Sequence, residues 1–310
     1  MERLTLGPEE ATELAAIARR HYVDGVSRVE IAKERGLSRF KVGRLLQTAH
    51  EAGIVRIEIR TPGDIDVALS ESLRQAFGLR RALVVRTADP DRVREPLGQV
   101  CAELLREIVT SEDVLGFDCG RTLRAMTGHL RGLAGCDVVQ LTGMGGELGE
   151  TAGDIARVVG EVNGGRVFPI YAPLVVPDAR TAQVLRSQRT IKSTTSAWQR
   201  VTIAVVAIGA WSRELSQTPA LIGPAETARL ARAGVVGETA ALLMDADGRR
   251  IPALDDRRIA IAERDLRAVP DRIGVAGGTG KAEAIRSMLR SGLLTSLVTD
   301  EHVARRLVES

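Results

Sequence analysis

The feature that most constrains the fold is a regular alternation of short apolar runs with helical patterns from residue 63 to residue 310. Apolar runs rich in β-branched residues are typical of strands buried on both faces. The runs expected to form strands are Ala82–Val85, Val114–Phe117, Val138–Leu141, Val167–Ile170, Ile203–Ile208, Ala240–Met244 and Ile273–Ala276. Strands that alternate with helices form parallel βαβ units. The sequence therefore predicts an α/β, doubly wound, Rossmann-like domain over residues 63–310, joined to the preceding residues by an amphipathic helix over Asp64–Phe77.

The segment before this domain, residues 1–62, has a different pattern, in which short helices follow one another closely. Ser27 followed three residues later by Glu30 is a capping box, which predicts that a helix begins at Arg28. Gly36 is suited to end that helix, because glycine adopts the left-handed conformation at little cost. A second helix is expected from Ser38, its cap, to Ala52.

A helix over about Pro8–Asp24 completes a three-helix core, so residues 1–62 are predicted to form a helix-turn-helix domain. The alternating segment Ile54–Ile59 predicts a strand that would form a small wing.

The second helix of this domain lies in a strongly basic segment, since Arg28–Gln47 holds six basic and two acidic residues. Arginine can donate two hydrogen bonds to a guanine edge, while lysine and serine more often hold phosphates. The residues expected to contact DNA are Arg28, Ser38, Arg39, Phe40, Lys41 and Arg44. The alternative is a solvated basic face on a three-helix bundle. The capping box, the glycine turn and the small Ala32 at the helix crossing favour DNA binding.

Three glycine-containing loops follow expected strands of the large domain, at residues 115–122, 140–147 and 276–281. The first and third lead into predicted helices, over Leu123–Leu130 and Ala282–Arg290, whose first backbone amides form an anion site. The carboxyl ends of parallel strands meet at one edge of a sheet, where ligands bind. Glycine after a strand is also common in plain turns, but three such loops in one domain favour a ligand site.

Nucleotide motifs do not fit these loops. A phosphate-binding P-loop would need glycine in place of Val275 and serine or threonine in place of Ala282. A dinucleotide fingerprint would need glycine in place of Leu148. These departures argue against a kinase, an ATPase and a dehydrogenase.

Composition excludes further classes of protein. Only 3% of the residues are aromatic, too few for a surface that stacks many bases of single-stranded nucleic acid. The three cysteines form no disulfide framework and the four histidines no metal cluster, so neither a metal nor a cofactor is expected. The start has no apolar signal segment, and the longest apolar run, Ile203–Trp211, is too short to cross a bilayer, so a cytoplasmic protein is expected.

The segment from His21 to Ile59 resembles the DNA-binding domain of the SorC/DeoR-type sugar-binding transcriptional regulators, and the resemblance continues through nearly the whole chain. It is carried by five further segments: Gly116–Thr122, Gln140–Met144, Gly237–Thr239, Gly277–Lys281 and Thr299–Glu301. The resemblance implies a helix-turn-helix domain followed by a domain related to phosphosugar isomerases and glucosamine-6-phosphate deaminase. It also implies a homo-oligomer, expected to be a tetramer, that binds operator double-stranded DNA and a small carbohydrate.

The resemblance also implies an effector site. In relatives, the backbone and threonine of the first loop and the lysine of the last hold a phosphate, and a carboxylate at the position of Glu238 orients sugar hydroxyls. The implied effector-binding residues are Gly116, Asp118, Cys119, Gly120, Arg121, Thr122, Gln140, Thr142, Gly143, Met144, Glu238, Gly277, Gly278 and Lys281. Cys119 is expected to be a small wall residue and not a redox sensor.

Asp118 departs from the family pattern, which has serine at this position. Like charges about 4 Å apart repel by roughly 4 kcal/mol at an effective dielectric constant near 20. We therefore expect an unphosphorylated sugar or polyol, with Asp118 accepting hydrogen bonds from its hydroxyls and Lys281 balancing the charge. The alternative is that Asp118 turns away from the ligand.

Two functions remain to be compared. The first is a transcriptional regulator of a carbohydrate-utilisation operon, controlled by a sugar, polyol or sugar phosphate. The second is a sugar-phosphate isomerase or deaminase that carries a DNA-binding domain. Such an enzyme needs a general acid and a general base beside its substrate. The loops supply Asp118 and Glu238 but no histidine, which favours the regulator.

Overall fold

The computed structural model describes residues 6–57, 64–145 and 151–309. The chain divides into two compact units, residues 1–60 and 61–310. The boundary expected between residues 62 and 63 lies outside the described residues. No helix within the described ranges is long and apolar enough to span a membrane.

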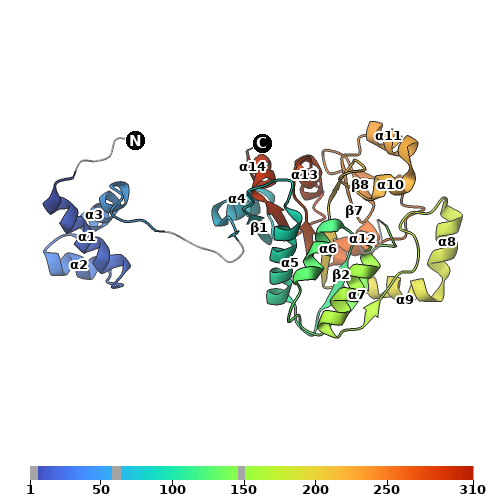
Figure 1. Ribbon diagram of the computed structural model, residues 1–310, viewed down its shortest axis with the longest axis horizontal. Helices are drawn as coiled ribbons and strands as arrows, with labels where there is room; N and C mark the ends of the chain where they lie inside the picture. Colours follow the sequence, from blue (N-terminus) through green and yellow to red (C-terminus); the bar gives the residue numbers. More distant parts are fainter. Residues whose placement is uncertain (1–5, 58–63, 146–150, 310) are drawn as a thin grey trace. The chain divides into compact units, whose positions relative to one another are not determined.

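Residues 6–57 of the N-terminal unit form the helices α1 (Pro8–Tyr22), α2 (Arg28–Arg35) and α3 (Arg39–Glu51) (Figure 1). The capping box at Ser27 and Glu30 is formed, and Gly36 ends α2 with a φ of 65°. The Ser38 hydroxyl accepts from the backbone N–H of Lys41 at 3.2 Å and caps α3. Apolar residues from the three helices form its core: Leu14, Ile17, Ala18, Ile31, Ala32, Val42, Leu46 and Ala49. The predicted helices and their caps are confirmed.

The wing predicted over Ile54–Ile59 is not formed by residues 54–57, and residues 58 and 59 lie outside the described residues. The backbone N–H of Val55 donates to the carbonyl of Ala49 at 3.0 Å, and Ile54 and Val55 both pack against the helical core. Neighbouring residues of a strand point to opposite faces. Because the consecutive residues Ile54 and Val55 both contact the same core, this segment lacks the alternation of buried and exposed side chains that the predicted strand would have.

The C-terminal unit is built on a parallel seven-stranded sheet in the order β1-β11-β10-β5-β2-β3-β4. Its strands are β1 (Arg81–Val85), β2 (Val114–Phe117), β3 (Asp137–Gln140), β4 (Val167–Phe168), β5 (Ile203–Ala207), β10 (Asp271–Val275) and β11 (Ser296–Asp300). From β2 the chain proceeds to β3 and β4 at one edge, and from β5 it proceeds through β10 to β11. The strand order therefore reverses between β2 and β5, the place where open α/β sheets bind ligands.

Helices cover both faces of this sheet. On one face α5 (Arg94–Ile108), α6 (Arg121–His129) and α7 (Ala152–Asn163) pack against side chains such as Phe117 and Val205. The other core contains Ala204 and Val206, with residues of the helices that follow. These helices are α4 (Val67–Phe77), α8 (Ala179–Ser187), α9 (Arg189–Ala197), α12 (Glu263–Ala268), α13 (Ala282–Arg290) and α14 (Glu301–Val308). Successive residues of β5 thus face opposite layers, which is why the strand is apolar throughout. The predicted doubly wound α/β fold is confirmed.

The run Ala240–Met244 was expected to form a strand of the parallel sheet, and this expectation is wrong. Its last residues form β8 (Leu242–Met244) in an antiparallel sheet of order β6-β7-β8-β9. The other strands of that sheet are β6 (Gly209–Ala210), β7 (Gly237–Thr239) and β9 (Arg250–Ile251). Elsewhere in this unit lie α10 (Thr218–Ile222), α11 (Pro224–Arg232) and the short 3₁₀ helix η2 (Trp198–Arg200). Ala240 and Ala241 have positive φ and form the two-residue turn between β7 and β8. A strand that follows such a turn pairs antiparallel with its predecessor.

The structure also contains a strand that the sequence analysis did not predict, β11 over Ser296–Asp300.

Helices α5 and α6 approach each other closely at Gly98. A Cβ atom on Gly98 would lie 2.6 Å from the backbone nitrogen of Met126. Gly98→Ala should therefore lower the free energy of unfolding by about 1–3 kcal/mol, because two helix backbones would have to separate. Chemical denaturation measures the change.

Gly128 in α6 is the matched control, since a Cβ there meets no atom within 4 Å. Gly128→Ala should raise stability by about 0.5–1 kcal/mol, because alanine restricts the unfolded chain. Equal effects of the two substitutions would contradict the close packing.

Candidate functional site

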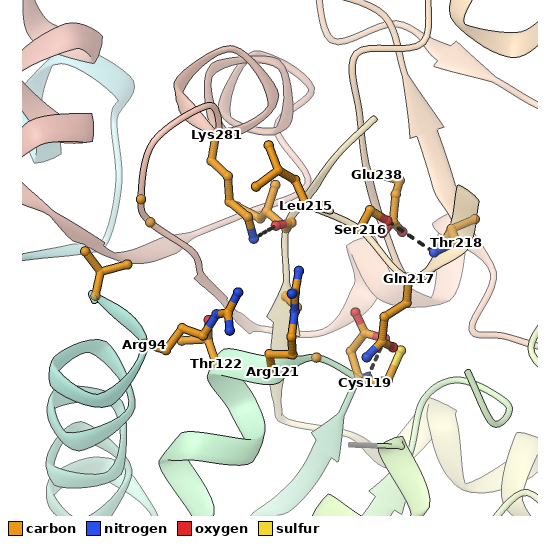
Figure 2. A pocket seen from close by; sticks show the side chains of 18 of the residues that line it. Arg94, Cys119, Arg121, Thr122, Leu215, Ser216, Gln217, Thr218, Glu238 and Lys281 are labelled. Carbon is orange, nitrogen blue, oxygen red and sulfur yellow. Dashed lines mark hydrogen bonds between the residues drawn. The ribbon is translucent and has the colours of Figure 1, made fainter. Parts of the chain in front are cut away.

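A cavity of about 130 Å³ opens at the carboxyl ends of β2, β5 and β10, beside the reversal of strand order (Figure 2). Of the predicted effector-binding residues, nine line it: Asp118, Cys119, Gly120, Arg121, Thr122, Glu238, Gly277, Gly278 and Lys281. The cavity is also lined by residues that sequence reasoning missed: Pro90, Asp91, Val93, Arg94, Leu174, Ala207, Ile208, Gly209, Leu215, Ser216, Gln217, Thr218, Ala241 and Thr279. Thr279 belongs to the third glycine loop, although it was not named as a candidate, and the other missed residues lie in segments without a recognised motif.

The first glycine loop brings the start of α6 to the cavity. Gly120 precedes the helix with a φ of 151°, and a Cβ on it would lie 2.7 Å from the Cβ of Ala207. No side chain of the described residues caps α6. The backbone amides of its first turn, with the hydroxyl of Thr122, are therefore available for an anion.

Three cationic side chains line the same cavity: Arg94, Arg121 and Lys281. The ammonium group of Lys281 donates to the carbonyl of Ile208 at 2.8 Å. Burial, with repulsion from Arg121 and Arg94, lowers the pKa of Lys281 to about 8. The guanidinium of Arg121 donates to the carbonyl of Glu214. This concentration of positive charge fits an anionic ligand.

Two buried carboxyl groups, those of Asp118 and Glu238, also line the cavity. Glu238 accepts from the Ser216 hydroxyl at 2.7 Å and from the backbone N–H of Ala241 at 3.0 Å. Burial, with repulsion from Asp118, raises the pKa of Glu238 to about 7. Burial likewise raises the pKa of Asp118, although hydrogen bonds from Cys119, Thr142 and Ala240 act in the opposite direction.

Asp118 lines the cavity and accepts hydrogen bonds from groups of the protein itself, and its role toward a ligand stays a prediction. It accepts from the backbone N–H of Cys119 at 2.7 Å, from the hydroxyl of Thr142 at 3.1 Å and from the backbone N–H of Ala240 at 3.2 Å. Lys281 is paired with a carbonyl instead of balancing this charge. The protein's own donors thus satisfy Asp118, and the repulsion that argued against a phosphate is reduced. Burial raises the pKa of the Cys119 thiol well above its ordinary value, so this cysteine stays protonated at neutral pH.

The third glycine loop is fixed by a residue for which the sequence analysis proposed no role. Asp300 accepts from the backbone N–H of Gly278 at 2.7 Å, and a Cβ on Gly277 would collide with its carboxylate oxygen. Asp300 also accepts from the backbone N–H groups of His302 and Val303, which cap α14. It therefore positions the loop that carries Lys281.

Five predicted effector-binding residues lie outside the cavity lining: Gly116, Gln140, Thr142, Gly143 and Met144. A Cβ on Gly116, inside β2, would lie 2.7 Å from Leu141. The Gln140 side chain bonds to backbone groups of Thr142 and Ile170, at 2.7 and 2.8 Å. The structure gives these residues packing and hydrogen-bonding contacts within the fold, and their role toward an effector stays a prediction.

The predicted DNA-binding residues all lie exposed on the N-terminal unit. The guanidinium of Arg39 lies over the ring of Phe40, 4.8 Å from its centroid, and Phe40 is 70% exposed. Arg20 bonds to Glu34 at 2.8 Å and links α1 to α2. These contacts give the unit an exposed basic helix on a fixed support.

The comparisons with known proteins cover almost the entire chain. Residues 64–309 match the family model described as "Putative sugar-binding domain". The transcriptional regulator LsrR of Klebsiella pneumoniae is 30% identical over 310 residues, which cover 98% of this chain and 94% of that protein. This chain belongs to the SorC/DeoR-type sugar-binding transcriptional regulators. LsrR of Escherichia coli K12 is 30% identical over 308 residues, 97% of this chain and 96% of that one.

A crystal structure of the full-length sorbitol operon regulator SorC from Klebsiella pneumoniae shares the fold of this regulator. It matches with a TM-score of 0.74 and 23% identity over 97% of this chain and 99% of that chain. The relatives named here are transcriptional regulators, and none is the isomerase or deaminase of the alternative hypothesis. Within the described ranges, no group of three or more histidine, cysteine, aspartate or glutamate side chains is arranged to hold a metal ion.

Glu238 should make the stability of this sugar-binding regulator fall with rising pH. The unfolded chain releases the Glu238 proton near pH 4.5 and the folded chain near pH 7. Between these values the folded state binds more protons, so the free energy of unfolding declines by about 3 kcal/mol. Glu238→Gln should remove this part of the decline, as measured by urea unfolding at pH 5 and pH 8.

The exposed Glu283 on α13 provides the control. Glu283→Gln should keep the pH dependence of the unmodified protein. Identical slopes for the two variants would show that Glu238 is not buried as an acid.

Proposed function

We propose that this regulator controls genes of carbohydrate use by binding operator DNA through residues 1–62 and a phosphorylated sugar through residues 63–310. The observation that supports the effector class most strongly is the gathering of Arg94, Arg121 and Lys281 around the uncapped start of α6. A phosphate accepts hydrogen bonds from guanidinium, ammonium and backbone N–H groups, and all of these line the cavity. The polar groups beside Glu238 then remain for the sugar hydroxyls.

The proposed DNA contacts are Arg39 and Arg44 to base edges, with Arg28, Ser38 and Lys41 at the phosphates. Their exposure on α2 and α3 supports this assignment, as does the orientation of Arg39 over Phe40. A homo-oligomer, expected to be a tetramer, would present paired domains to half-sites separated by whole helical turns of about 10 base pairs. The effector would alter DNA binding only if it favours one quaternary state over another.

Lys281→Met should weaken the binding of phosphorylated sugars at least ten-fold, because a charge-assisted contact to the anion is lost. Isothermal titration calorimetry with pentose and hexose phosphates, beside their unphosphorylated parents, measures this. The exposed Lys192 on α9 is the control, and Lys192→Met should leave the affinity unchanged. If only the unphosphorylated parent sugars bind tightly, the proposal that the effector is phosphorylated is refuted.

Arg39→Ala should weaken binding to DNA from upstream of the protein's own gene by about 1–3 kcal/mol if Arg39 contacts a guanine. Gel retardation at several salt concentrations separates this loss from the general phosphate attraction, which falls steeply with salt. Arg19→Ala, on α1, removes the same charge from another helix and should cost less. Equal retention of unrelated DNA before and after the Arg39 change would rule out base contacts.

A further inference from the structure

Residues 212–218, here called the covering segment, run from β6 to α10 and close one side of the cavity (Figure 2). Two contacts hold them in place. The carbonyl of Glu214 accepts from Arg121, and the hydroxyl of Ser216 donates to Glu238 at 2.7 Å. The covering segment therefore has a defined position relative to both the cationic and the acidic sides of the cavity.

Gln217 is the unusual residue of this segment. Its Nε2 and Oε1 atoms are both buried, and neither has a hydrogen-bond partner within the described part of the chain. The side chain points from the covering segment toward Cys119, into the cavity (Figure 2). By contrast, the neighbouring Ser216 hydroxyl has hydrogen-bond partners within the protein: it donates to Glu238 and accepts from the backbone N–H of Thr218 at 3.2 Å.

A buried amide without partners is unfavourable, and native proteins rarely keep one that serves no purpose. An amide offers one acceptor and two donor hydrogens side by side. The group that complements it is one that both donates and accepts, as a sugar hydroxyl does. Gln217 is thus built to receive the uncharged, hydroxylated part of a ligand.

The charges around the cavity give the ligand a direction. Arg94 and Lys281 lie on the left of Figure 2 and Arg121 near its centre, while Gln217 and Glu238 lie on the right. A second anionic group at the Gln217 end would lie beside the Gln217 amide and the Glu238 carboxyl group, away from Arg94 and Lys281, and neither of these two groups stabilises an anion as a cationic side chain does. The two ends therefore suit one anionic group and one neutral group.

We propose that Gln217 is a specificity-determining residue that selects effectors with a single phosphate and a hydroxylated, uncharged far end. This inference rests on the proposed function, because it takes the phosphate to lie at Arg94, Arg121 and Lys281. It goes further in excluding bisphosphates and in assigning the far end of the ligand to the covering segment.

The test is calorimetric titration of the full-length protein with inorganic phosphate and with a set of hexoses and pentoses. Each sugar is titrated in three forms: unphosphorylated, as the monophosphate and as the bisphosphate. We expect the best monophosphate to bind at least ten-fold more tightly than its bisphosphate and than inorganic phosphate. In Gln217→Met, which keeps the length of the side chain without its amide, the affinity ratio of monophosphate to inorganic phosphate should fall at least ten-fold. The unliganded variant should unfold at a temperature no lower than the unmodified protein, because an unpaired amide has been removed. Gln217→Ala provides a second variant if Gln217→Met fails to fold.

Gln99→Leu, at an exposed position on α5, is the control and should keep the unmodified ratio. A bisphosphate that binds as tightly as the monophosphate would overturn the proposal, as would an unchanged ratio in both Gln217 variants. Failure of every phosphate compound, inorganic phosphate included, to bind would overturn the proposed phosphate site itself. Binding of phosphate with an unchanged ratio would overturn the role of Gln217 alone.

Discussion

The hydrogen bonds that join two buried carboxyl groups to the turn between β7 and β8 determine the shape of the cavity. Asp118, directly after β2, accepts from the backbone N–H of Ala240, and Glu238, in β7, accepts from that of Ala241. Both alanines have positive φ, a conformation that is unfavourable for L-residues because the Cβ atom approaches the following carbonyl oxygen. The hydrogen bonds to the carboxyl oxygens offset part of this cost. They also fix the antiparallel sheet against the end of the parallel one, so the same interactions unite the fold and delimit the site.

This arrangement also limits what the two carboxyl groups can do. The carboxyl groups that could act as acid and base are held by the protein's own N–H and hydroxyl groups, and no histidine lines the described cavity. Under the proposed function, the free energy of effector binding at this cavity is available to favour one state of the protein over another.

Local signals in the sequence were sufficient for much of the fold and part of the site. The capping box at Ser27 and the glycine stop at Gly36 act within a few residues, so the N-terminal helices could be predicted closely. The glycine loops could also be predicted to meet, because parallel strands end at one edge. Long-range choices could not be predicted: β8 pairs with β7 across a tight turn, and Gln217 reaches the cavity from a segment with no motif. The second glycine loop was predicted to reach the ligand site, and the structure shows that the Gln140 side chain bonds to backbone groups of Thr142 and Ile170, a long-range choice that its polarity did not reveal.

The depressed pKa of Lys281 connects the site to the acidity of its surroundings. An anion bound beside this ammonium group favours its charged form, so the complex holds on to a proton that the empty site would release near pH 8. Occupancy and proton uptake are then linked quantities, and each must respond to the other. Under the proposed function the phosphate ester is doubly ionised in this range, so its apparent dissociation constant should begin to rise near pH 8, where the empty site loses the Lys281 proton. Effector binding and protonation of one lysine are in that way a single coupled equilibrium.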